Sequence, residues 1–420
     1  MFSTLRNAWK IPDLRKKMLY TLIMIAIFRL GSAIPVPGID KSKLATLFAG
    51  DDGLLGFFNL MSGGAFKNFT IFALGISPYI TASIIVNLLT IAFPTLEAIS
   101  KEGPEGRKKL TQYTRYGTVI LALIQAFGIS VGLFRNAFIT YDSVSIFVSI
   151  VTLTAGTAFL MYLGEKITEN GIGNGISLFI FAGIIGRFPT GLLSTFGKFQ
   201  NGEVGILNIL LFGVIIVAVI VAVIYIQQGT RKVPVQYAKR VVGRKMYGGH
   251  STHIPLKVNQ AGVIPVIFSV SILMFPLTIA QFWPTGSVYT WLQANMGPQS
   301  VFYNVLYVIF IIFFTYFYTS VTFNPVEVAS NMKQNGGFIP GIRPGKPTAE
   351  YLQKTLSRIT VAGALFLAAI AVLPTVLLAF SKLQISFGGT PLLIAVGVAL
   401  ETSKQIEAQM VMRHYQGFLK

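Results

Sequence analysis

Long apolar stretches without charged residues recur along the whole chain. A stretch of about 18 or more such residues is long enough to cross the roughly 30 Å hydrocarbon layer of a membrane as an α-helix. We therefore predict an all-α membrane protein with ten transmembrane helices, which places both termini on the same side. The ten predicted spans lie near residues 18–36, 70–94, 116–134, 143–164, 170–186, 204–228, 258–280, 300–323, 359–380 and 383–400.

Positively charged residues divide unevenly between the two sides of this arrangement. With cytoplasmic termini, the cytoplasmic segments hold 26 Lys and Arg and the opposite loops hold 7, while Arg29 lies inside the first span. Cytoplasmic loops of membrane proteins carry such an excess, so we expect both termini in the cytoplasm. The net charge of +19 alone also suits a nucleic-acid-binding protein, but 53% hydrophobic and only 12% charged residues argue against a soluble fold.

The first span also has a feature of secretory signals, because Arg15, Lys16 and Lys17 precede it. It lacks a convincing cleavage site, and nine further spans follow it. We therefore expect this span to be retained as a membrane helix.

A short apolar segment, residues 54–66, lies between the first two spans and is too short to cross a bilayer. It is either a re-entrant or plugging element or an interfacial helix. Irregular backbone at membrane depth is tolerated only beside protein or a water-filled cavity. The Gly63-Gly64 pair therefore favours a cavity next to this segment.

Two cytoplasmic connections, residues 230–257 and 324–358, are longer than a turn requires. The first is rich in Lys and Arg, and the second places Arg343 between Pro340-Gly341 and Pro344-Gly345. Turn residues at this density hold a tight loop tip. Such charges also steer membrane insertion, and for most of the lysines that explanation is equally good. For Arg343 we favour a docking role.

The spans lack the groups that transport chemistry and catalysis require. Ion-coupled transporters need ionisable groups at mid-membrane, and only Arg29 lies well within a span. There is no cysteine, and the three histidines make a metal site improbable. The run 171–175 superficially matches a phosphate-binding loop, but no strand precedes it, so we interpret it as a flexible start of the fifth span whose glycines allow close packing. We expect no cofactor and no enzymatic activity. A multi-span solute transporter is the alternative, and an intramembrane enzyme is a weaker one.

Isoleucines recur at one-turn spacing in the second and fifth predicted spans. Residues four apart share one face of a helix. Such isoleucines commonly face lipid or another helix, but the second span also carries several polar residues and is only marginally apolar, which favours a helix beside an aqueous path. The two sets are Ile76, Ile80 and Ile84, and Ile176, Ile180 and Ile184.

Seven stretches of the sequence together resemble the SecY family, the central subunit of the bacterial protein-export translocon. The resemblance runs from about residue 16 to the end of the tenth span. The loop tip 246–249 and the tail after Arg413 look least similar, which puts partner contacts there in doubt. The matching stretches are FRLGSAIPVPGID (28–40), FALGISPYITASII (72–85), EGRKKLTQYTRYGT (105–118), GIGNGISLFIFAGI (171–184), STHIPLKVNQAGVIPVIF (251–268), NPVEVASNMKQNGGFIPGIRPG (324–345) and FGGTPLLI (387–394).

The resemblance implies two pseudo-symmetric five-helix halves that form a clamshell around a central pore. The halves are residues 1–186 and 204–420, joined by an external hinge loop at 187–203. Unfolded preproteins would cross through the pore, and apolar signal peptides and membrane anchors would leave sideways into the lipid bilayer. The implied location is the bacterial cytoplasmic membrane. The implied partners are SecE, SecG, the motor ATPase SecA and the ribosome.

The resemblance also assigns candidate site residues. A pore ring falls on Ile76, Ile80, Ile180, Ile184, Ile267 and Ile394. The plug falls on Phe57, Phe58, Asn59, Leu60, Met61, Ser62, Gly63 and Gly64. A lateral gate between spans two and three and spans seven and eight is lined by Asn87, Gln125, Asn259 and Phe275. Docking of the motor or ribosome falls on Lys239, Arg240, Arg244, Lys245 and Arg343.

Overall fold

The fold was analysed in a computed structural model of the chain. It describes residues 2–40, 42–44, 59, 62–202, 205–237, 240–242, 245–247, 251–280, 286–297, 300–381 and 389–418.

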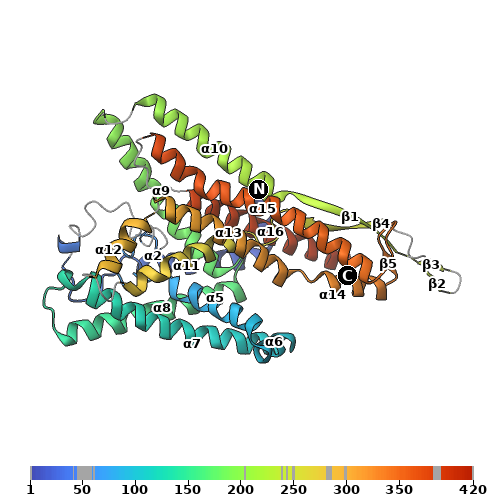
Figure 1. Ribbon diagram of the computed structural model, residues 1–420, viewed down its shortest axis with the longest axis horizontal. Coiled ribbons are helices and arrows are strands. Elements are labelled where there is room, and N and C mark those ends of the chain that lie inside the picture. Colours follow the sequence, from blue (N-terminus) through green and yellow to red (C-terminus); the bar gives the residue numbers. More distant parts are fainter. Residues whose placement is uncertain are drawn as a thin grey trace.

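Helices form most of the structure, and each of the ten predicted spans overlaps one of them (Figure 1). A π-helical turn, Ile129–Leu133, and a 3₁₀ turn, Arg135–Ala137, follow α7. The α-helices are α1 (Phe2–Lys10), α2 (Pro12–Gly31), α5 (Ser77–Ala92), α6 (Pro94–Lys101), α7 (Pro104–Gly128), α8 (Ser143–Asn170), α9 (Gly175–Gln200), α10 (Ile206–Gln228), α11 (Ile264–Ala280), α12 (Ser287–Asn295), α13 (Val301–Thr322), α14 (Pro325–Gln334), α15 (Lys346–Ser381) and α16 (Gly389–Phe418).

Within the described residues, five helical segments are individually long and apolar enough to cross a membrane. A sixth candidate is the pair α5 and α6, which is bent by 102° where Pro94 begins α6. Segments within α10 and α11 are apolar but shorter. The expectation of an all-α membrane protein is confirmed.

The second predicted span is shorter than expected, because residues 62–76 form turns rather than helix. Three glycines there have positive φ, Gly63 at 68°, Gly64 at 94° and Gly75 at 57°. Side chains with a Cβ rarely adopt this backbone conformation, and a run of such residues cannot continue a right-handed helix. The helix therefore begins only at Ser77.

The external hinge loop expected at 187–203 is mostly helix, and this expectation was wrong. α9 continues through Pro189 and ends at Gln200. Its end is capped by Asn201, whose backbone N–H donates to the carbonyl of Gly197, and by Gly202 with φ of 73°. Pro189 removes one helical N–H, but the true stop signal is the Asn-Gly pair that begins twelve residues later.

The long connections expected as loops contain strands. β1 (Thr230–Tyr237) lies between β4 (Ser251–Lys257) and β5 (Gly337–Phe338), and it pairs antiparallel with both. A separate hairpin joins β2 (Arg240–Val242) and β3 (Lys245–Tyr247). The sheet buries a small core with α14 and α15, made of Val233, Val235, Leu256, Met332, Ile339 and Leu352.

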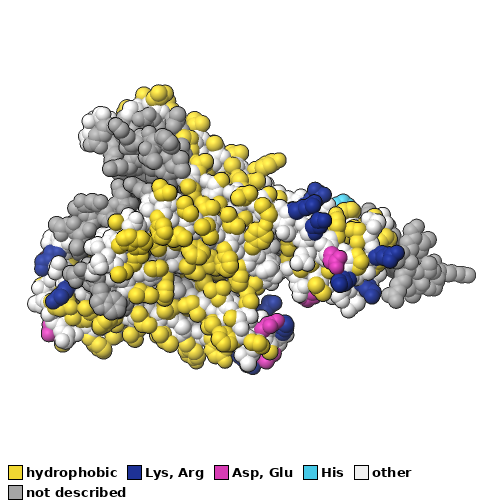
Figure 2. Space-filling view, in the orientation of Figure 1, with side chains coloured by type: hydrophobic (Ala, Val, Ile, Leu, Met, Phe, Trp, Pro, Cys, Tyr) yellow, Lys and Arg dark blue, Asp and Glu magenta, His cyan; other side chains and the backbone are white. Residues whose placement is uncertain are grey.

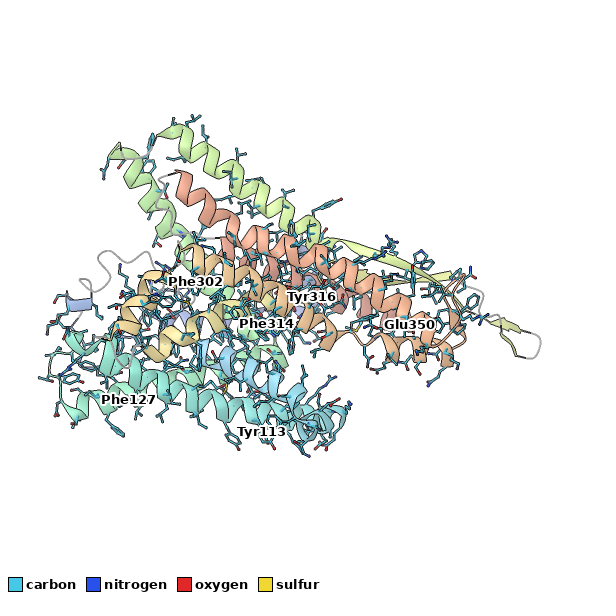
Figure 3. All side chains as sticks on the ribbon, in the orientation of Figure 1. Tyr113, Phe127, Phe302, Phe314, Tyr316 and Glu350 are labelled. Carbon is cyan, nitrogen blue, oxygen red and sulfur yellow. The ribbon has the colours of Figure 1, made fainter. Side chains whose placement is uncertain are left out.

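Apolar and charged side chains lie in different regions of the surface (Figure 2). Hydrophobic side chains cover the helices, whereas many charges gather around the sheet and beside α6. Figure 3 shows aromatic side chains along α7 and α13 and places Glu350 at the sheet end of α15. Tyr113 and Phe127 of α7 and Phe302 and Tyr316 of α13 are exposed, as suits helices that face lipid.

Close helix packing depends on glycine at several positions, and Gly156 of α8 is the clearest. A Cβ at Gly156 would overlap the carbonyl oxygen of Ile71. We expect Gly156→Ala to lower the free energy of unfolding by about 1–3 kcal/mol, because overpacking forces the backbone apart. Denaturant unfolding in detergent measures this. Gly213→Ala in α10 is the control, since no atom lies within 4 Å of its added Cβ. An equal loss in both variants would contradict the packing argument.

Candidate functional site

Six isoleucines, five of them on four helices and one in the turn before α5, belong to one large buried hydrophobic cluster, and we call these six the collar. They are Ile76 and Ile80 of the α5 region, Ile180 and Ile184 of α9, Ile267 of α11 and Ile394 of α16. Each of them is at most 6% exposed. The helices that carry them are in contact. α5 contacts α11, α9 contacts α16, and α11 contacts α16. The six side chains thus belong to one packed region of the molecule.

Not every isoleucine of the periodic sets has the same surroundings. Ile84 is buried in the same cluster as the collar. Ile176 is only partly buried, and it packs against Gly164 of α8, where an added Cβ would lie 2.6 Å from its Cδ1. The periodicity in α9 therefore combines helix packing at its start with collar residues one and two turns later.

A collar of this composition has clear physical properties. Isoleucine is branched at Cβ, so its rotamer is stiff, and a ring of such side chains would keep a defined width. Aliphatic side chains offer no hydrogen bonds, and a narrow hydrophobic constriction expels water and thereby blocks ions. The same surface gives a passing polypeptide no strong contacts.

The described part of the predicted plug precedes the turns that lead into α5, and it is held by hydrogen bonds. The Asn59 side-chain oxygen accepts from the backbone N–H of Lys67 at 3.0 Å, and the Ser62 hydroxyl oxygen accepts from the N–H of Phe66 at 3.0 Å. Asn59 and Ser62 are buried. Of the other candidates, Gly63 and Gly64 form the turn, whereas Phe57, Phe58, Leu60 and Met61 lie outside the described residues.

The predicted lateral gate is a seam where α11 contacts α5 and α7. Gln125 and Asn259 are buried, with 7% and 5% exposed, whereas Asn87 and Phe275 are exposed. The Asn259 amide donates to the carbonyl of Gly262 at 2.9 Å, and its oxygen is buried and has no hydrogen-bond partner among the described residues. Its hydrogen bond thus closes its own turn rather than reaching across the seam.

Comparison with known proteins decides the family. A family model described as SecY matches residues 70–403. A "Protein translocase subunit SecY" of Halalkalibacterium halodurans is 51% identical over all of both chains, and that of Escherichia coli K12 is 45% identical over 98% of this chain and 95% of its own length. The chain belongs to the SecY family.

Solved structures agree with this SecY assignment at the level of the fold. A SecY protein whose plug domain stabilises the closed state of the translocation channel matches with a TM-score of 0.68 at 20% identity, over 97% of both chains. Sec61 in a canine ribosome-channel complex matches with a TM-score of 0.59 at 18% identity, again over 97% of both chains. The resemblance of the seven sequence stretches is thereby confirmed.

Three of the five docking residues expected from the SecY family are described, and they lie at the sheet end of the molecule. Arg343 is exposed, and its carbonyl accepts from the Thr348 hydroxyl at 2.8 Å. Gly341 and Gly345 on either side have φ of 81° and 99°, so the Pro-Gly framing does form a tight turn. Arg240 and Lys245 lie in the hairpin of β2 and β3, where only the backbone is described, and Lys239 and Arg244 lie outside the described residues.

The glycine run 171–175 is closely packed, as the sequence predicted. Gly171, Ile172 and Gly173 are buried. A Cβ at Gly175 would overlap the carbonyl of Gly164 in α8, so the close packing was rightly expected. Asn174 begins α9, and its side chain accepts from the N–H of Ser177 at 3.1 Å.

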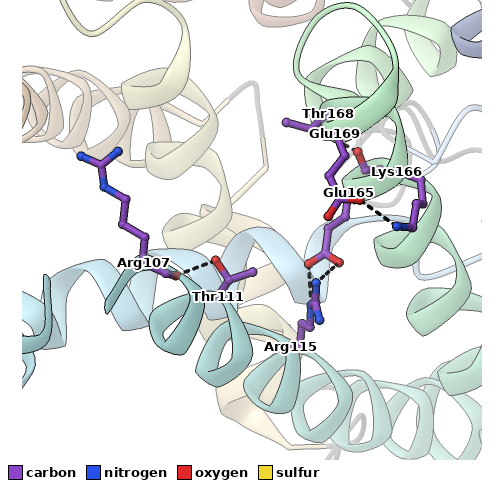
Figure 4. Close-up of polar contacts among 8 residues, drawn as sticks. Arg107, Thr111, Arg115, Glu165, Lys166, Thr168 and Glu169 are labelled. Atoms are coloured by element: carbon purple, nitrogen blue, oxygen red, sulfur yellow. Dashed lines mark hydrogen bonds and ion pairs between the residues drawn. The ribbon is translucent and has the colours of Figure 1, made fainter. Parts of the chain in front are cut away.

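Two contacts near the helix ends were missed by sequence reasoning (Figure 4). Arg115 of α7 binds Glu165 of α8 in a two-point ion pair, with distances of 2.9 Å from Nε to Oε1 and 2.8 Å from Nη2 to Oε2. Lys166 pairs with Glu169 at 2.7 Å one turn further along α8. The first pair joins residues fifty positions apart in the sequence, so no short-range spacing of charged residues predicts it.

We expect Glu165→Gln to lower the free energy of unfolding by about 1 kcal/mol, because a bidentate pair with one largely buried partner exceeds an ordinary surface pair. Thermal unfolding of the purified protein in detergent measures the loss. The control is Glu105→Gln, which breaks a 3.7 Å pair with Lys108 in which both side chains are more than three-quarters exposed. Equal stability of the Glu165 variant and the parent would contradict the expectation.

Proposed function

We propose that this chain forms a channel through which unfolded proteins cross the bacterial cytoplasmic membrane. The observation that carries the proposal is the collar, because its isoleucines come from both halves of the chain and belong to one buried cluster that also contains Ala65 of the segment 54–66. A hydrophilic chain cannot enter hydrocarbon, because each unpaired backbone group would cost several kcal/mol. A conduit through the protein removes that cost. The collar closes around whatever fills the conduit.

Two halves of the chain, residues 1–186 and 204–420, would move apart along the seam of α11 with α5 and α7. An apolar signal peptide or membrane anchor would leave through this seam into the lipid. The short link between α9, which ends at Gln200, and α10, which begins at Ile206, would serve as the hinge of this motion. The lateral-gate role of Asn87, Gln125, Asn259 and Phe275 remains part of this proposal.

External partners would supply the energy that drives the substrate through the channel. The sequence has no nucleotide-binding loop, so a motor ATPase of the SecA type, or a translating ribosome, would drive the substrate. Both termini and the sheet end would face the cytoplasm, since the basic segments lie there. Small membrane subunits of the SecE and SecG type would complete the complex. No catalytic role is proposed for the chain itself.

Reversal of one charge tests the docking surface. Arg343→Glu is expected to abolish motor-driven preprotein transport, because the tight turn presents this cation to the partner. The folded channel should still accumulate in the membrane. Lys346→Glu is the matched control, since Lys346 is exposed three residues away but outside the glycine-framed turn. The assay is ATP-dependent transport into vesicles, and normal transport by the Arg343 variant would refute the docking role.

Reconstitution tests the proposed function as a whole. Proteoliposomes that contain this chain with its membrane subunits should protect a radiolabelled preprotein from added protease when motor and ATP are present. The solute-transporter alternative predicts substrate uptake without any protected preprotein. Absence of protected preprotein in the complete system would contradict the proposal.

A further inference from the structure

We propose that Arg29 is a positioning residue that fastens the plug segment to α9 when the channel is closed. The inference rests on the proposed function, and it assigns a role to a cation that the channel mechanism so far does not use. Arg29 lies near the end of α2 and is half-buried. A charged residue within a membrane span is costly and commonly marks a functional position.

The guanidinium of Arg29 bridges two segments that are far apart in the sequence. Its Nη1 donates to the carbonyl oxygen of Gly63 in the plug turn at 3.2 Å. Its Nη2 donates to the carbonyl oxygen of Ala182 in α9. Ala182 lies between the collar residues Ile180 and Ile184 along the same helix. One side chain therefore joins α2, the plug and the part of α9 that carries the collar.

Glycines leave the space that the Arg29 side chain occupies. A Cβ at Gly186 would overlap the guanidinium, so the arginine needs glycine at that position of α9. A Cβ at Gly63 would lie 3.0 Å from the Cα of Gly183 and 3.2 Å from Nη1 of Arg29. Gly63 also has φ of 68°, which directs its carbonyl into this contact at little steric cost. Plug, α9 and arginine thus meet at close approach.

The hydrogen bonds of Arg29 are of a kind that can break when the plug moves. Arginine is always charged and presents several N–H donors in a fixed planar fork, so it can hold two acceptors at once. Both acceptors here are neutral backbone carbonyls rather than carboxylates. The plug carbonyl is released when the plug moves, while the bond to α9 can remain. The bridge therefore favours the closed position without making it permanent.

Chemical labelling of a single plug thiol tests the proposal. The chain has no cysteine, and Ser62 is 3% exposed, so Ser62→Cys provides one buried thiol in the plug. In this background and with the whole channel complex in vesicles, Arg29→Met is expected to raise the rate of labelling by a membrane-impermeant maleimide at least tenfold. The resting ion leak of the vesicles should rise with it. Arg29→Lys, which retains the charge but lacks the planar fork of donors, should give an intermediate rate.

Glycine variants separate the bridge from a general loss of folding. Gly186→Ala should displace the guanidinium and raise labelling as Arg29→Met does, and the double variant should label no faster than Arg29→Met alone. Gly197→Ala, on the same helix but with open space around its Cβ, should label like the parent. If Arg29→Met fails to accumulate in the membrane, Gly186→Ala and Arg29→Lys carry the test.

Parent-like labelling and leak in Arg29→Met, or in both other variants if it does not accumulate, would overturn the proposal. Failure of the proposed function has a different signature, because the parent itself would then transport no preprotein. Plug labelling does not depend on transport, so the two outcomes remain distinguishable.

Discussion

Exchange of Ile80 and Ile394 for asparagine is expected to turn a closed channel into one that leaks ions at rest. These side chains come from α5 and α16, so the two changes alter the collar from both halves of the chain. Each amide left without partners in an apolar collar costs about 1–3 kcal/mol, which favours a hydrated constriction by about tenfold or more. A hydrated constriction conducts ions, whereas a dry one does not.

Single-channel recording in planar bilayers measures the leak. The control is the pair Ile80→Val and Ile394→Val, which keeps β-branched aliphatic side chains and should leave the resting conductance near that of the parent. A parental resting conductance in the asparagine variant would contradict the role of the collar as the ion barrier.

A disulfide across the seam between α5 and α11 is expected to abolish both preprotein transport and membrane insertion. The two helices contact each other and lie in different halves, so a covalent link prevents them from separating. The chain has no cysteine, which means that an introduced pair can form only the intended link. Addition of a reductant should restore both activities.

A cysteine pair across the contact between α7 and α8 is the matched control. These helices also touch, but both belong to the first half and need not separate. Transport should therefore survive oxidation of that pair. If the oxidised pair between α5 and α11 supports normal export and insertion, the sideways opening of the channel is wrong.

The sequence predicted the membrane helices well, because hydrocarbon imposes a simple rule on length and charge. Periodicity alone also identified four of the collar isoleucines, and resemblance to the SecY family supplied Ile267 and Ile394. That these six side chains share one cluster is a property of the three-dimensional packing. Their role as the pore ring stays a prediction until transport is measured.

Other features escaped sequence reasoning for physical reasons. The hinge loop was expected at 187–203, but the helix continues through Pro189 because one missing N–H does not end a helix, and α9 ends only before Asn201 and Gly202. The sheet of β1, β4 and β5 was missed because its strands pair across long separations in sequence. The ion pair of Arg115 with Glu165 and the bridge made by Arg29 are long-range contacts of the same kind.

Photo-crosslinking of a polypeptide arrested in transit tests the central claim most directly. A photoreactive residue is introduced singly in place of Ile80, Ile184 or Ile394, and in place of Leu207 on α10, whose side chain is 74% exposed on the lipid-facing surface. A preprotein halted midway should form adducts at all three collar positions and none at Leu207. Adducts at Leu207 with none at the collar would show that proteins do not pass through the collar.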